Sequence, residues 1–212
     1  MGKSSSPPLA CMMCAKGEWD FLTTLGNQRR YVAGLRFVDD MSCFVAYNAK
    51  RRDGEKKARE ILRMFENCYD RALTLKRTDN DEKTWEFLGC ELNVRDNYPY
   101  LGCYQAVKNE PYLVNGSSLT FGAFQDFGSW TCKRAKLAVI VSALHQIEAN
   151  SFPGSGMIRA VILVKMELRR RDYPSHYFDR GMRNFSRDKG NTWKMIAELR
   201  KGDTYEREMI DR

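Results

Sequence analysis

Two apolar runs separated by a pair of aspartates decide the fold. The stretch reads YVAGLRFVDDMSCFVAY over residues 31–47. Both runs are rich in the aromatic and β-branched residues that favour extended strands. Because the polar break between them, Asp39-Asp40, is only two residues long, the pattern predicts an antiparallel hairpin with both carboxylates at its tip.

The residues after this hairpin predict one helix and further strands. Apolar residues recur at spacings of three and four from Ala58 to Ala72, the period of an amphipathic helix. Alternating segments follow at residues 73–77, 85–94 and 100–107, separated by polar turns. We therefore expect an α+β arrangement with an antiparallel sheet and a packed helix.

The remaining sequence predicts a helical region and a lead-in. Helices are expected at residues 133–149 and 157–168, the second ended by Tyr173-Pro174, and around 193–200. Residues 1–28 contain Ser, Pro and Gly and are expected to be poorly ordered, apart from a short helix at 19–25. The predicted parts are a lead-in (1–28), an α+β part (29–115) and a helical part with a charged tail (116–212).

Charge favours a polyanionic partner. The 212 residues contain 35 Lys and Arg against 27 Asp and Glu, a formal net charge of +8. Nucleic acid is the first candidate, with a membrane surface or solubility alone as alternatives. No apolar run reaches the roughly 18 residues of a spanning helix, and no signal peptide is recognisable, so we expect an intracellular protein that is not inserted in a membrane.

Cysteine and histidine usage limits the chemistry. Seven cysteines are an odd number, and several lie in apolar segments, which argues against a disulfide framework. Cys11 and Cys14 have the spacing of half a zinc site, but no second pair follows, and the only histidines are His145 and His176. So few imidazoles also argue against a hydrolase triad.

The Asp39-Asp40 pair is the strongest candidate for a site. A solvated hairpin tip is the simplest explanation for two adjacent aspartates. A tight turn, however, would hold both carboxylates at a fixed place, and hard oxygen ligands of this kind suit Mg²⁺ together with substrate phosphates. Such a site would serve phosphoryl or nucleotidyl transfer.

Three blocks in this order resemble the palm of reverse transcriptases. Phe37-Val38-Asp39-Asp40 resembles motif C, the helix at 54–69 with the strand at 73–77 resembles motif D, and WEFLGCEL at 85–92 resembles motif E. Residues 130–185 are similar, more loosely, to the region after the palm in Penelope-like retroelement reverse transcriptases. The resemblance implies a partial polymerase palm followed by a helical, thumb-like region.

The resemblance also implies roles for single residues. Asp39 would bind both catalytic Mg²⁺ ions, and Asp40 would have a less direct ligand role. Lys76, or else Lys83, would offer a cation to the pyrophosphate; either is otherwise an ordinary surface lysine. The residues implied in the primer grip or in nucleic-acid binding are Phe87, Leu88, Gly89, Lys133, Arg134, Lys136, Arg169, Arg170 and Arg171. A packed strand with a turn, and solvated helix faces, are the alternatives for these nine.

One part of the family pattern is absent. A palm needs a further aspartate, from motif A, well upstream of motif C, but only 38 residues precede Asp39 and Asp20 is too near. The resemblance therefore implies the C-terminal part of an RNA-directed DNA polymerase that is inactive alone, unless a partner chain supplies the fingers. Its ligands would be an RNA template, a DNA primer or duplex and, if active, deoxynucleotide triphosphates. The alternatives are a non-catalytic nucleic-acid-binding module and a protein-interaction remnant that pairs through an exposed sheet edge.

Overall fold

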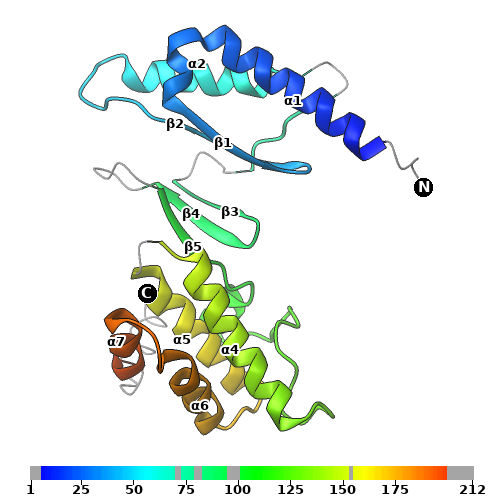
Figure 1. Cartoon of the computed structure of the whole chain (residues 1–212), viewed down its shortest axis with the longest axis vertical. Helices are drawn as coiled ribbons and strands as arrows, with labels where there is room; N and C mark the ends of the chain where they lie inside the picture. Colours follow the sequence, from blue (N-terminus) through cyan, green and yellow to red (C-terminus); the bar gives the residue numbers. More distant parts are fainter. Residues whose placement is uncertain (1–5, 70–72, 79–82, 95–100, 153–154, 200–212) are drawn as a thin grey trace. The chain divides into compact units, whose positions relative to one another are not determined.

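The computed structural model describes residues 6–69, 73–78, 83–94, 101–152 and 155–199. In chain order the elements are α1 (Ser6–Leu25), the 3-10 helix η1 (Gly26–Tyr31), β1 (Val32–Phe37), β2 (Asp40–Val45), α2 (Gly54–Glu66), β3 (Thr84–Phe87), β4 (Cys90–Val94), β5 (Leu101–Gln105), α3 (Glu110–Val114), α4 (Lys133–Asn150), α5 (Ser155–Arg170), α6 (Ser175–Ser186) and α7 (Asn191–Leu199) (Figure 1). This mixture of helices and small antiparallel sheets agrees with the expected α+β class. The described helices include none long and apolar enough to span a bilayer.

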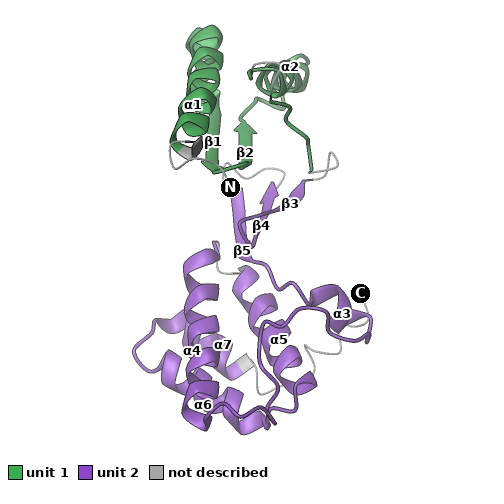
Figure 2. Ribbon diagram, turned by 90° about the vertical axis from the view of Figure 1, so that its right-hand side faces the viewer, with its two compact units in different colours: residues 1–80 green, residues 81–212 purple. Residues whose placement is uncertain are grey.

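The chain divides into two compact units, residues 1–80 and 81–212 (Figure 2). The segment 29–115, predicted as one α+β part, contributes to both units. Its hairpin and first helix lie in unit 1, and its later strands lie in unit 2 with the helical region.

Unit 1 is a hairpin covered by two helices. β1 and β2 pair antiparallel from Val32 opposite Val45 to Phe37 opposite Asp40. This confirms the predicted hairpin but places its turn at Val38 and Asp39, whereas Asp39 and Asp40 were expected there. Helices α1 and α2 lie on the same side of it (Figure 1). Phe21 and Leu25 of α1 and Ile61 of α2 are buried there, with Val32 and Val45 packed against them. Burial of this apolar face is the main force that holds the unit together.

Two expectations for unit 1 were wrong. Helix α1 begins at Ser6 rather than near Trp19, because Pro residues are tolerated in a first helical turn and the following residues are mostly good helix formers. Residues 73–77, expected as a strand, have no regular structure. Among the described residues the hairpin sheet consists of β1 and β2, so this short segment has no hydrogen-bonded neighbour there, as a strand requires.

Unit 2 begins with a three-stranded sheet in the order β3-β4-β5. The alternating segment 85–94, expected as one strand, is two strands joined by a turn at Leu88 and Gly89. Both turn residues have positive φ, 52° and 75°, as a type I′ hairpin turn requires. The strand expected at 100–107 is confirmed as β5, and the backbone of Cys103 pairs with Phe152 beyond it.

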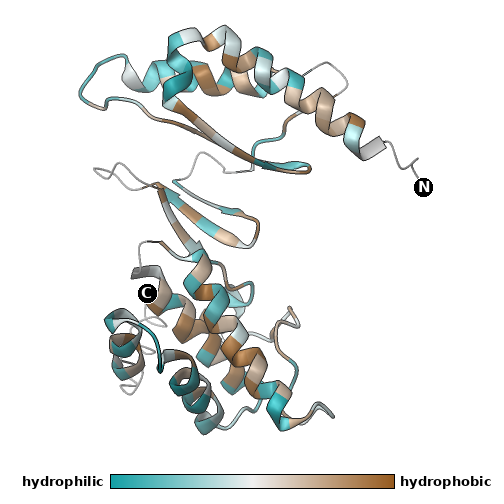
Figure 3. Ribbon diagram, viewed as in Figure 1, coloured by the Kyte–Doolittle hydropathy of each residue, from teal (hydrophilic) through white to brown (hydrophobic). Residues whose placement is uncertain are grey.

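Four longer helices form the core of unit 2. The helices expected at 133–149, 157–168 and 193–200 are confirmed as α4, α5 and α7. Figure 3 shows apolar residues gathered on α4 and α5, and Ile140, Leu144 and Leu168 are among the core residues. Helix α6 was not expected; Pro174 was predicted to end a helix, and it also stands at the N-cap of the next one.

Candidate functional site

The hairpin turn places Asp39 and Asp40 in different local environments. Phe37 pairs with Asp40, so Val38 and Asp39 are the two turn residues and Asp40 is the first residue of β2. Val38 has a φ of 56°. A β-branched residue in this region is sterically strained, at a cost of roughly 1–3 kcal/mol, and such residues cluster at functional sites.

Both carboxylates face solvent. Asp39 and Asp40 are exposed, and within the described residues neither carboxylate has a hydrogen bond or an ion pair. Strand alternation puts Asp40 and Phe37 on the hairpin face opposite to Val32 and Val45, which face the helices. Two consecutive residues at the tip therefore carry carboxylates that no described residue neutralises.

A polar network ties the base of this turn to the helices. Arg36 of β1 forms an ion pair with Glu18 of α1, with 3.1 Å between Nε and Oε1. The Tyr69 hydroxyl donates to the same oxygen over 2.7 Å and lies 2.9 Å from the sulfur of Met41 on β2. Burial and the neighbouring Glu18 carboxylate raise the pKa of Tyr69, so this phenol remains a donor. Both strands next to the turn are thus held in place.

Neither lysine expected near the pyrophosphate lies in a helix or strand. Lys76 is exposed in the segment 73–78, which has no regular structure. The predicted motif D strand at 73–77 is therefore wrong. Lys83 is exposed just before β3 and belongs to unit 2. Within unit 1, no regular element therefore fixes Lys76 near the carboxylates.

The three residues expected in the primer grip form the tight turn between β3 and β4. Phe87 is half-buried, whereas Leu88 is 51% exposed. Gly89 adopts a φ of 75°, and its carbonyl accepts hydrogen bonds from the Ala106 amide and the Gln105 side chain. The glycine therefore has a conformational reason to be present, independent of any ligand.

Of the basic residues expected on α4, two face solvent and one does not. Lys133 and Arg134 are exposed in the first turn. Lys136 is only 6% exposed, and its ammonium donates to the carbonyls of Phe127 and Ser129 and lies 5.0 Å from the centre of the Phe127 ring. This is a correction, because Lys136 stabilises a connection within the protein instead of pointing towards a duplex.

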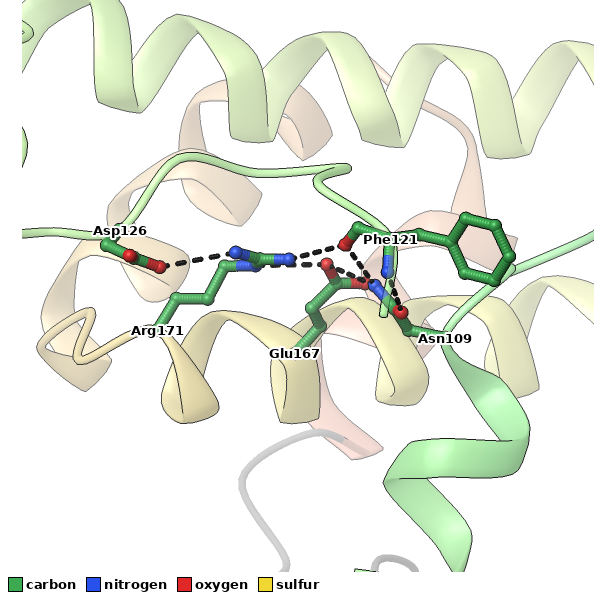
Figure 4. A network of polar contacts seen from close by, with 5 residues as sticks. All are labelled: Asn109, Phe121, Asp126, Glu167 and Arg171. Atoms are coloured by element: carbon green, nitrogen blue, oxygen red, sulfur yellow. Dashed lines mark hydrogen bonds and ion pairs between the residues drawn. The ribbon is translucent and has the colours of Figure 1, made fainter. Parts of the chain in front are cut away.

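The arginines at the end of α5 also differ from one another. Arg169 and Arg170 are exposed, and Arg170 donates to the Ser117 carbonyl. The Arg171 side chain is largely buried; it binds Glu167 and Asp126 and donates to the Phe121 carbonyl (Figure 4). Arg171 is a second correction, since its donors are occupied inside the protein.

Glu167 is the centre of this network and was missed as such by sequence reasoning. Its side chain is fully buried, and Oε1 accepts from Asn109 over 2.8 Å and from Arg171 over 3.1 Å (Figure 4). Its second oxygen has no partner in the part of the chain that the structure describes. Burial raises the pKa of Glu167 against the opposing influence of Arg171 and Asn109. A glutamate four residues before an arginine was the available signal.

The described residues offer few donor atoms for a metal ion. Over the described ranges, no three His, Cys, Asp or Glu side chains gather into a metal-binding group. Asp39 and Asp40 alone match a Mg²⁺ ion that keeps most of its waters, but a two-metal centre requires additional carboxylates. Cys11 and Cys14 likewise belong to no such group.

Comparisons with known proteins found no matching family model, no matching curated protein and no matching solved structure.

Proposed function

We propose that the chain is the C-terminal part of a reverse transcriptase domain, with a partial palm and a helical thumb, in which Asp39 and Asp40 bind Mg²⁺ for nucleotidyl transfer. The single observation that carries the proposal is the hairpin turn. It presents two exposed carboxylates, which no described residue pairs with, after a strained Val38. The strands on either side of the turn are held to the rest of unit 1 by Arg36 and Tyr69.

The two carboxylates would hold the metal in unequal ways. Asp39 projects from the turn itself, and Asp40 projects from the first position of β2. Bound Mg²⁺ would lower the pKa of a primer hydroxyl and neutralise charge on the departing pyrophosphate. The protein's own contribution is to fix the backbone of both residues in the hairpin, without a competing cation from the described residues.

A complete polymerase centre would need a further carboxylate from another strand. In the part of the chain that the structure describes, β1 and β2 pair only with each other. Each therefore retains an outer edge with unpaired backbone groups, to which an additional strand can bind. We propose that the missing aspartate arrives on such a strand, from a partner chain or from another segment.

Metal binding tests the proposal without requiring polymerase activity. Mn²⁺ added to the ¹⁵N-labelled protein should broaden the amide signals of residues 38–41 first. Asp39→Asn combined with Asp40→Asn should remove this broadening, while Asp20→Asn, an exposed aspartate of α1, should preserve it. Broadening that begins elsewhere, or that survives the double substitution, would contradict the assigned role.

A non-catalytic nucleic-acid-binding module is the second candidate. The observation that favours it is the exposure of Lys133, Arg134 and Arg170 at helix ends of unit 2. Phosphate contacts there would give affinity that falls steeply with salt. In a filter-binding titration, Lys133→Ala with Arg134→Ala should flatten the salt dependence, whereas Mg²⁺ and the Asp39 and Asp40 substitutions should have no effect.

A further inference from the structure

A groove in unit 1 lies at the end of the hairpin away from Asp39 and Asp40. Its volume is about 550 Å³, and it runs between the chain after β2 and the start of α2. Tyr31 and Tyr47 line it, so we call it the tyrosine groove. With about 3.3 Å per residue along a strand, it is roughly 20 Å from the turn.

Exposed tyrosines and buried aliphatic side chains both line the tyrosine groove. Tyr31 is 44% exposed and Tyr47 is 51% exposed, although both are large rings that burial would stabilise. Ala58 and Ile61 of α2 are buried and also line the groove. A nucleobase can stack on either exposed tyrosine ring, next to the aliphatic side chains that also line the groove.

The local backbone fixes the segments that carry the two tyrosines. The Ala46 amide donates to the Tyr31 carbonyl over 2.8 Å. At Gly54 an added Cβ would lie 2.5 Å from the Asn48 carbonyl oxygen and 3.3 Å from the Tyr47 ring. Only glycine permits this approach, and it allows the Tyr47 ring to rest on the first turn of α2. The groove is therefore built before any ligand arrives.

Arg51, Lys57 and the carboxylate of Asp53 line the groove. Arg51 lines the groove, is exposed, and its guanidinium has no ion pair or hydrogen bond with another described residue. Arg30 lies 4.8 Å from the centre of the Tyr31 ring and donates to its hydroxyl. Lys57 is neutralised by Asp53 over 2.5 Å. Arg51 is thus the cation best placed to receive a phosphate.

We propose that the tyrosine groove binds single-stranded nucleic acid, with bases stacked on Tyr31 and Tyr47 and a phosphate at Arg51. Stacking platforms next to cations are the usual means of binding single strands without reading their sequence. A duplex fits poorly, because its bases already stack on one another. The proposal shares only its class of ligand with the proposed function, and it requires no metal.

Fluorescence anisotropy with a labelled single-stranded oligonucleotide of about twelve residues, in buffer without Mg²⁺, tests this proposal. Tyr31→Leu and Tyr47→Leu should each weaken binding roughly ten- to a hundredfold, because each removes a stacking platform. Tyr31→Phe and Tyr47→Phe should bind as the wild type does. This pair of substitutions separates stacking from folding, since the Phe variants retain the ring.

Arg51→Ala should weaken binding and reduce the slope of log affinity against log salt by about 0.7, the value for one phosphate on a single strand. The matched control is Arg63→Ala, an exposed arginine at the other end of α2, which should change affinity less than about twofold. Equal effects of the two arginine substitutions would overturn the proposal, as would Leu variants that bind like the wild type.

Two competitors distinguish other ligands. A duplex of the same length should compete much less well than the unlabelled single strand; equal competition would overturn the proposal. Vesicles with anionic lipid should not bind through the groove, so vesicle binding that the Leu variants abolish would also overturn it. Asp39→Asn with Asp40→Asn should leave oligonucleotide binding intact, and groove variants should leave Mn²⁺ broadening intact.

Discussion

Asn109 donates a hydrogen bond of 2.8 Å to Glu167, and both side chains are fully buried. The same Asn109 amide donates to the Phe121 carbonyl, and its oxygen accepts from the Phe121 amide. One asparagine therefore joins α5 to the connection between α3 and α4 (Figure 4).

Asn109→Ala should strongly destabilise the protein. It removes three hydrogen bonds, each worth about 1 kcal/mol, and leaves buried partners unsatisfied. We expect the free energy of unfolding, measured by urea titration, to fall by about 3 kcal/mol. Asn184→Ala, at an exposed position of α6, is the control and should change it by less than about 0.5 kcal/mol. Equal losses for both variants would contradict this role.

Glu167 should make stability depend on pH. Because burial raises its pKa in the folded state above the unfolded value, the protonated form is favoured on folding. Its contribution is complete below the unfolded pKa and is lost as pH rises through the raised value. Unfolding titrations between about pH 4 and about pH 8 should show this decline in the wild type. Glu167→Gln, which cannot ionise, should lack this component; an unchanged pH profile would refute it.

Val38→Gly should stabilise the protein. Relief of the strained φ of 56° outweighs the added entropy of glycine in the unfolded chain, for a net gain of about 0.5 kcal/mol. Ala33→Gly, within β1 of the same hairpin, should instead lower the free energy of unfolding by up to about 1 kcal/mol. Loss of stability in Val38→Gly would show that the turn is unstrained.

Substitutions of Lys136 and Lys133 should differ in their effect on stability. Lys136→Met leaves the Phe127 and Ser129 carbonyls without their donor, so we expect a loss of about 2–3 kcal/mol by urea titration. Lys133→Met, one turn earlier and exposed, should change stability by less than about 0.5 kcal/mol. Equal stability of the two variants would contradict the buried placement of Lys136.

Cysteine alkylation should follow exposure. Burial raises the pKa of the Cys43 thiol to about 11, so little reactive thiolate exists near neutral pH. With iodoacetamide at about pH 8, peptide mass spectrometry should find Cys11 and Cys132, both exposed, modified well before Cys43. The rate at Cys43 should rise as pH approaches about 11. Early modification of Cys43 would place it at the surface.

The sequence predicted the parts of the fold that repeat a strong local pattern. The hairpin at 31–47 and helices α2, α4, α5 and α7 follow from alternation or from helical spacing. Helix α1 was largely missed because its apolar residues do not follow one face: Met12, Met13 and Trp19 are exposed while Phe21 is buried. Helix α6 was not predicted, although its sequence contains the signal: Phe178, Met182 and Phe185 recur at helical spacing, and all three are buried.

The candidate site was predictable only where geometry is local. The hairpin follows from the two apolar runs, but its turn lies at Val38 and Asp39, one residue before the break that the sequence indicates. The internal roles of Lys136 and Arg171 do not, because their partners lie in an irregular connection whose path no periodicity reveals. The tyrosine groove was missed for a similar reason: Tyr31 and Tyr47 are both visible in the sequence, but only pairing of the strands brings them to one end of the hairpin.

The connection between α3 and α4 owes its shape to side chains from outside it. Phe121, Phe127 and Ser129 each give a backbone carbonyl to Asn109, Arg171 or Lys136. What those donors recognise is backbone, which every residue type offers. Substitutions within the connection should therefore leave its backbone path largely intact, whereas substitution of Asn109, Arg171 or Lys136 should change that path.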